Sequence, residues 1–167
     1  MNQLFTRLSL FMLLAIGFIQ VSEAQVSLQF LGRYSTGFYN LAAAEISAYD
    51  AGTKRLFVAN SADTSIKIVD LSNPANPTLI SSISLKPYGI DLNSVACNNG
   101  LVATCVIDSL GKTVNGKVVF FNTSGTFLRQ VRVGANPDMV TFTKDGKKAV
   151  VANEGEPSDY RQIDPVG

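Results

Sequence analysis

The sequence predicts an all-β fold, a partial β-propeller with about two and a half to three four-stranded antiparallel blades. One strand pattern occurs three times at a spacing of roughly 46 residues, which is typical of propeller blades. In the third copy, a turn at Asp145-Gly146 lies between two runs rich in β-branched residues, and the second run ends in Val-Ala-Asn. The first copy covers residues 50–60, and a divergent second copy covers residues 98–108.

The amino-terminal segment has the features of a secretory signal peptide. Arg7 supplies a positive charge, the run from Leu8 to Ile19 is almost wholly apolar, and small residues lead to Ala24. The alternative is a membrane anchor, but a spanning helix needs about 20 apolar residues and this run is shorter. We therefore expect residues 1–24 to be removed and residues 25–167 to form the amino-terminal, incomplete part of a propeller domain.

Alternation of apolar and polar residues predicts the individual strands. Val26–Leu31 is expected to be a strand, which in a closed propeller would complete the last blade and protect its edge. The strands expected in the three blades are Ala44–Asp50, Leu56–Ala59, Ser65–Asp70 and Thr78–Leu85, then Ile90–Ala96, Leu101–Ile107, Lys117–Asn122 and Phe127–Val133, and finally Met139–Thr143 and Lys148–Ala152. The positions expected to be buried include Val58, Val69, Val102, Val119, Phe120, Val140 and Val151. Because the third blade has only two strands, we expect the sequence to be a piece of a longer protein.

Two cysteines flank the turn at Asn99-Gly100. With a two-residue turn, Cys97 lies opposite Val102 and Cys105 points to the other face of the sheet. With a three-residue turn, the cysteines share a face but lie roughly 13 Å apart at about 3.3 Å per residue, which is too far for a disulfide. We therefore expect two buried free thiols.

Composition excludes several functions. The formal net charge of +1 gives neither a basic face for nucleic acid nor an acidic tail. The sequence has no histidine, which within these residues excludes a Ser-His-Asp triad, a histidine-ligated zinc site and a histidine general base. No phosphate-binding loop or nucleophile motif occurs, so no catalytic residue is predicted.

Acidic residues follow the second strand of each blade, on the face where the links between blades also lie. They are Asp63 in the first copy, Asp108 in the second, and Glu154, Glu156 and Asp159 in the third. Converging carboxylates and carbonyls suit a hard cation such as Ca²⁺, which takes about six to eight oxygen ligands. The alternative is that these residues are solvated turn formers, an ordinary role of aspartate in loops. The third loop is denser in acid than a turn requires, so Ca²⁺ remains the candidate cofactor.

Three segments resemble a known family. They are Leu31–Gly37, Ile68–Leu71 and, most specifically, Val151–Asp159 with the following Asp164-Pro165. The repeat resembles the YVTN-type propeller repeat, and the segments are similar to the choice-of-anchor I family of secreted bacterial proteins. The mesenchyme-specific cell-surface glycoproteins of echinoderms share this domain. The resemblance implies a secreted or surface-displayed propeller, held in longer members by variable carboxy-terminal anchors.

Two functions are compatible with these features. We expect a non-catalytic extracellular binding or adhesion module for an unidentified ligand, secreted or at the cell surface, with periplasmic transit in a bacterium. It would meet a membrane only through an anchor outside this sequence, and no nucleic-acid partner is expected. The alternative is a metal-dependent hydrolase, alkaline-phosphatase-like or lactonase-type, with the acidic residues as ligands and metal-bound water as nucleophile. The absence of an evident nucleophile or base favours the binding module.

Overall fold

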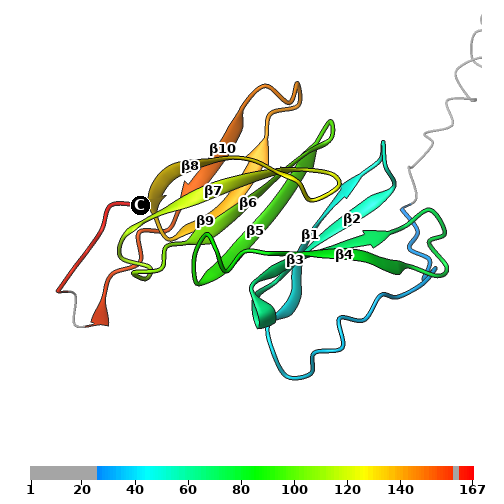
Figure 1. Ribbon diagram of the computed structural model, residues 1–167, viewed down its shortest axis with the longest axis horizontal. Coiled ribbons are helices and arrows are strands. Elements are labelled where there is room, and N and C mark those ends of the chain that lie inside the picture. The colour runs from blue at the N-terminus through cyan, green and yellow to red at the C-terminus, as the bar shows by residue number, and fades with distance from the viewer. Residues whose placement is uncertain (1–25, 160–161) are drawn as a thin grey trace, which may run out of the picture. The chain divides into compact units, whose positions relative to one another are not determined.

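The computed structural model describes residues 26–159 and 162–167, and its regular elements are almost entirely β-strands (Figure 1). The exception among the named elements is η1 (Ser61–Asp63), a single 3₁₀ turn. The expected all-β fold is therefore confirmed. No helix in these described residues has the length and apolar character needed to cross a membrane. The expected signal peptide, residues 1–24, lies outside the described residues.

The first sheet is antiparallel, and its strands follow one another in sequence order (Figure 1). They are β1 (Ala43–Asp50), β2 (Arg55–Asn60), β3 (Ser65–Asp70) and β4 (Thr78–Ser84). The central strands β2 and β3 are buried along most of their length, whereas the edge strand β4 is mostly exposed. Asp50 closes the turn after β1, because its carboxylate accepts hydrogen bonds from the Thr53 backbone N–H at 2.8 Å and the Thr53 hydroxyl at 2.7 Å.

The second sheet repeats this antiparallel order. Its strands are β5 (Asp91–Asn98), β6 (Leu101–Ile107), β7 (Asn115–Asn122) and β8 (Phe127–Ala135). Asn99 and Gly100 form a two-residue turn between β5 and β6, with φ of 47° and 82°. Asparagine and glycine tolerate these positive values, which such a hairpin requires. Cys97 consequently lies opposite Val102, as expected for the two-residue turn.

Both cysteines are free thiols, as predicted, but only one of the two is buried as expected. Cys105 is fully buried and Cys97 is partly buried. Burial raises the pKa of Cys97 to about 11 and that of Cys105 to about 12. Both side chains therefore stay protonated at neutral pH and are poor nucleophiles, because the thiolate is the reactive form.

The third sheet is a hairpin. Its strands are β9 (Pro137–Phe142) and β10 (Ala149–Asn153). The turn is formed as the sequence predicts: the Asp145 carboxylate accepts hydrogen bonds from the Thr143 hydroxyl at 2.6 Å and from the Lys147 N–H at 3.1 Å. Gly146 has a φ of 68°, a conformation that glycine adopts without steric cost. The hairpin corresponds to the first two strands of each complete sheet.

The first strand of each sheet lies beside the first strand of the next, since β5 packs against both β1 and β9 (Figure 1). A cavity of about 450 Å³ follows these three strands and is lined by residues that include Ile46, Ser94 and Met139. The threefold sequence repeat thus corresponds to successive sheets packed side by side, as expected of neighbouring blades.

Two apolar clusters lie between the sheets. The larger cluster joins the first and second sheets through buried residues that include Phe57, Ile66, Ile68, Leu92, Val102, Val119 and Phe121. The smaller cluster joins the second and third sheets through Ala103, Cys105, Val118 and Val140. Phe121 of the larger cluster contacts the rings of Tyr88 and the more exposed Phe127, and the three ring centroids lie 5.5 to 6.2 Å apart. Burial of such rings contributes much of the stability of a core.

Most positions expected to be buried are buried. They are Val58, Val69, Val102, Val119 and Val140. Phe120 and Val151 are partly buried and pack at the margin of the smaller cluster. They are partly exposed because the third sheet, as described, has two strands and covers only part of the second sheet. Beside Phe120, an apolar cavity of about 320 Å³ is left open.

The prediction of a strand at Val26–Leu31 is wrong. No residue from 26 to 36 is in a strand, and the side chains of Val26, Leu28 and Phe30 are 90, 99 and 81% exposed. A strand needs a neighbour to complete its backbone hydrogen bonds, and no described strand pairs with this segment. The alternating pattern is therefore compatible with an extended segment, but it does not identify a neighbouring strand that would make the segment part of a sheet.

Candidate functional site

The loops that follow the second strands lie on the same face as the links between sheets, as expected. The Ser61 hydroxyl donates a hydrogen bond to the Leu92 carbonyl at 3.1 Å, so the first such loop contacts the start of the second sheet. The Glu154 backbone N–H donates to the Asn136 carbonyl at 2.9 Å, so the third loop contacts the link before its own sheet. We call this surface the loop face; it comprises residues 61–64, 85–93, 108–114, 136 and 154–159.

Asn136 lies at the centre of the loop face, between β8 and β9. It is 1% exposed and has a φ of 45°, which asparagine tolerates better than most residues. Its side-chain amide donates hydrogen bonds to Oε2 of Glu154 at 2.7 Å and to Oε2 of Glu156 at 3.1 Å. Its amide oxygen accepts a hydrogen bond from Nδ2 of Asn93 at 3.3 Å. One buried amide therefore joins the acidic loop to the first strand of the second sheet.

An ion pair also crosses between the loops of the second and third sheets. Nζ of Lys112, in the loop after β6, lies 2.7 Å from Oε2 of Glu156. The hydrogen bond to Glu156 raises the pKa of Lys112 above its ordinary value. Because both side chains are about half exposed, the pair contributes little stability by itself. The pair links the loop after β6 to the acidic loop.

Two further predicted metal ligands, Asp63 and Asp108, pair with lysines of their own sheets. Asp63 accepts hydrogen bonds from the Lys67 ammonium and the Ser65 hydroxyl. Burial acts to raise the pKa of Asp63, but these hydrogen bonds outweigh it and hold the pKa below its ordinary value. Oδ2 of Asp108 lies 3.3 Å from Nζ of Lys117. Both carboxylates are thus ionised and already have a cationic partner.

The structure brings together two of the five predicted metal ligands, Glu154 and Glu156, around Asn136. Asp159 is exposed at the end of the acidic loop. Across residues 26–159 and 162–167, no group of three or more histidine, cysteine, aspartate or glutamate side chains is close enough to hold a metal ion. Ca²⁺ remains a prediction, and a site here would need further oxygens from backbone carbonyls and water.

Sequence reasoning missed the asparagines in and next to the loop face. Asn93 and Asn136 belong to it, and Asn60 and Asn153 end the strands directly before it. Asn60 caps η1 by accepting a hydrogen bond from the Ala62 N–H at 3.1 Å. Buried Nδ2 of Asn60 and Oδ1 of Asn153 have no hydrogen-bond partner in the described part of the chain. The repeated Val-Ala-Asn ending could have drawn attention to Asn60 and Asn153, because an asparagine at the same strand end in two copies indicates a shared local role.

A glycine makes room for one of these asparagines. A Cβ atom at Gly134 would lie 2.6 Å from the side chain of Asn153, which is closer than real Cβ contacts come. The Gly-Ala-Asn-Pro segment therefore serves two purposes: the glycine accommodates Asn153, and the asparagine two residues later binds the acidic loop.

The fold and the loop face define an all-β repeat protein in which four-stranded antiparallel sheets present their loops on one side. The family model of the choice-of-anchor I domain matches residues 45–167, and the chain belongs to this family. The resemblance drawn from the sequence is thereby confirmed.

One solved structure, hydrazine synthase from Kuenenia stuttgartiensis, is similar to the chain with a TM-score of 0.55 and 18% sequence identity. The similarity covers 74% of this chain and 33% of that chain, so this chain spans about a third of its length. At this identity the likeness concerns the fold alone. No curated protein matches the sequence.

Proposed function

We propose that the chain is the amino-terminal part of a β-propeller that is secreted or displayed at the cell surface and acts as a non-catalytic binding module. Membership of the choice-of-anchor I family carries this proposal, because that family assignment associates the domain with the cell surface. The hydrogen-bonded loop face supports it. Binding residues are commonly placed on loops that a rigid scaffold positions, and here buried Asn136 fixes the acidic loop.

The packing of the sheets supports the propeller. Between the first two sheets, Ile68 on β3 and Ile83 on β4 lie where they would contact a Cβ atom at Gly125, so the first sheet packs against the β7–β8 turn of the second sheet. The corresponding face of the second sheet carries the open apolar cavity of about 320 Å³ lined by Phe120 and Leu128. Further strands added beside β10 would cover it, as they do in complete propeller blades.

A hydrolase assay distinguishes this function from its alternative. The full-length protein is expected to show no hydrolysis of p-nitrophenyl phosphate or of a simple lactone above background, with or without divalent metal. Saturable hydrolysis that is lost when Glu154 and Glu156 are replaced by glutamine would contradict the non-catalytic proposal and favour the metal-dependent hydrolase.

Calcium binding at the acidic loop is the finer part of the proposal. In the full-length protein, Ca²⁺ is expected to raise the melting temperature, and chelation is expected to lower it. A ligand that binds only the folded state adds about 2.7 kcal/mol at one hundred times its Kd. The double substitution Glu154→Gln and Glu156→Gln keeps the side-chain shape but removes two charges. Most of the Ca²⁺-dependent rise in melting temperature, measured by calorimetry, should therefore disappear.

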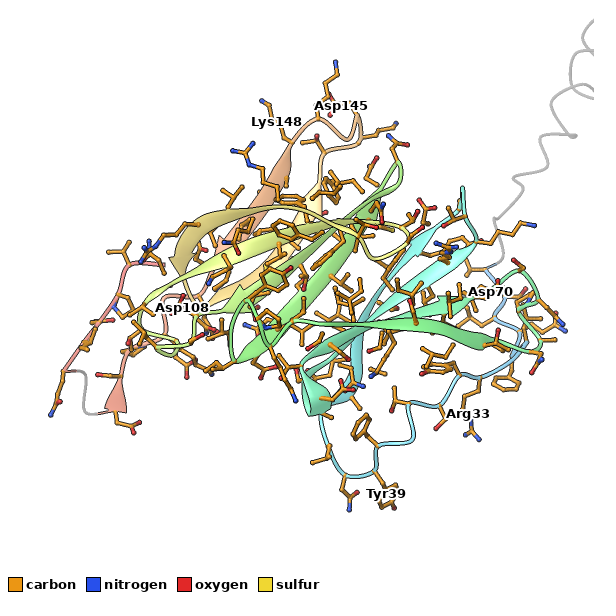
Figure 2. The ribbon with its side chains drawn as sticks, in the orientation of Figure 1. Arg33, Tyr39, Asp70, Asp108, Asp145 and Lys148 are labelled. Carbon is orange, nitrogen blue, oxygen red and sulfur yellow. The ribbon has the colours of Figure 1, made fainter. Side chains whose placement is uncertain are left out.

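Asp145→Asn is the matched control for this experiment. Figure 2 shows Asp145 at the β9–β10 turn, at the opposite end of these strands from the loop face. The Asp145→Asn substitution also removes a carboxylate charge, and it is expected to leave the effect of Ca²⁺ on the melting temperature intact. An equal shift in the wild type and the glutamine double variant would show that the acidic loop holds no calcium.

A further inference from the structure

A polar cavity of about 260 Å³ lies on the second sheet. Its lining consists of Asp108, Asn115, Lys117, Gln130 and Arg132. Four of these residues lie on β7 and β8, and Asp108 directly follows β6, so strands position most of them. The cavity is too small for a large ligand but has room for one small polar group. Figure 2 shows the location of Asp108.

The cavity carries an excess of positive charge. Lys117 and Arg132 are direct partners in the β7–β8 register, and like charges placed opposite each other on neighbouring strands repel. One carboxylate opposes them: Oδ2 of Asp108 lies 3.3 Å from Nζ of Lys117. Asp108 also accepts a hydrogen bond from the Leu110 backbone N–H through Oδ1 at 3.1 Å, which fixes its orientation. The hydrogen bond from the Leu110 N–H and the positive charges of Lys117 and Arg132 hold the pKa of Asp108 below its ordinary value. The lining has a formal charge of +1, and within the described residues Arg132 forms no ion pair.

The hydrogen-bond donors of the cavity are available to a ligand. Within the described residues, the Arg132 guanidinium and the side-chain amides of Asn115 and Gln130 donate no hydrogen bond to the protein. A guanidinium offers a planar fork of N–H groups that matches the two oxygens of a carboxylate. Asp108 adds an acceptor that can take the hydrogen of a hydroxyl group.

We propose that this cavity binds the carboxylate of a small hydroxy acid, such as a sugar acid, with Arg132 as the bidentate donor. Lys117 supplies the second positive charge, the two amides supply further donors, and Asp108 accepts a hydrogen bond from a neighbouring ligand hydroxyl. The site is separate from Glu154 and Glu156 and does not depend on calcium.

Isothermal titration of the full-length protein with sodium glucuronate, at constant ionic strength, tests this site. The wild type is expected to bind glucuronate. Arg132→Gln should weaken binding about tenfold or more, because it removes hydrogen bonds to a charged group. Arg33→Gln removes the same charge from an exposed position outside the cavity lining and should leave binding unchanged (Figure 2). Both replaced side chains are exposed, so both variants should retain the wild-type circular dichroism spectrum.

Three results would overturn the proposal. The first is no binding of glucuronate by the wild type. The second is an equal loss of affinity in the Arg132 and Arg33 variants, which would show a non-specific effect of net charge. The third is binding of glucose as tightly as glucuronate, since glucose has the hydroxyls but lacks the carboxylate that Arg132 is proposed to hold.

Discussion

Replacing Phe121 by alanine is expected to lower the free energy of unfolding by about 3 to 5 kcal/mol. The side chain is 1% exposed and lies between the first two sheets, where its ring contacts those of Tyr88 and Phe127. Removing it leaves a cavity that the surrounding strands cannot fill without moving. Urea denaturation of the full-length protein, followed by circular dichroism, measures the loss.

Phe127→Ala is the control for this substitution. Phe127 belongs to the same group of rings, stacked on Tyr88 at 5.5 Å, but is 46% exposed. Because about half of its surface is already in water, its removal should cost roughly half as much as that of Phe121. A loss for Phe127→Ala as large as that for Phe121→Ala would show that the first two sheets do not pack as described.

Asn136→Ala is expected to destabilise the protein by about 2 kcal/mol and to release the acidic loop. The substitution removes the hydrogen bonds to Glu154 and Glu156 and places alanine at a φ of 45°. Glu154 is exposed and Glu156 is partly exposed, so both carboxylates can turn to water, which limits the cost. Denaturation measures the stability, and limited proteolysis between residues 154 and 159 measures the freedom of the loop.

Asn136→Gly separates the two causes, because glycine accepts the positive φ but makes no side-chain hydrogen bond. It should be more stable than the alanine variant and equally sensitive to protease in the acidic loop. Wild-type resistance of that loop in both variants would mean that the side chain of Asn136 does not fix it.

The hairpins could be predicted from the sequence because their determinants are local. Asn99-Gly100 and Asp145-Gly146 supply the positive φ that tight turns need, and β-branched runs flank them. The strands Ser65–Asp70 and Leu101–Ile107 begin and end at the predicted residues. Placing the loops of successive sheets on one face followed from the same local pattern, since every second strand runs in the same direction.

Contacts between distant residues could not be predicted in this way. Asn136 binds Asn93 and Glu154, which are 43 and 18 residues away in sequence, and no local pattern indicates those pairs. The phenylalanine pair in β7 is a second example: the β7–β8 register shifts between Phe120 and Phe121, and Phe121 becomes the fully buried one. Asp63 and Asp108 were visible as acids, but the lysines that pair with them follow from strand geometry.

Export from the cytoplasm tests the proposed function most directly. The apolar run and the small residues before Gln25 predict cleavage after Ala24. Amino-terminal sequencing of the full-length protein recovered from its native cells is expected to give a chain that begins at or near Gln25, found outside the cytoplasm or on the cell surface. A chain that retains Met1 and remains in the cytoplasm would contradict the assignment as a secreted or surface-displayed binding module.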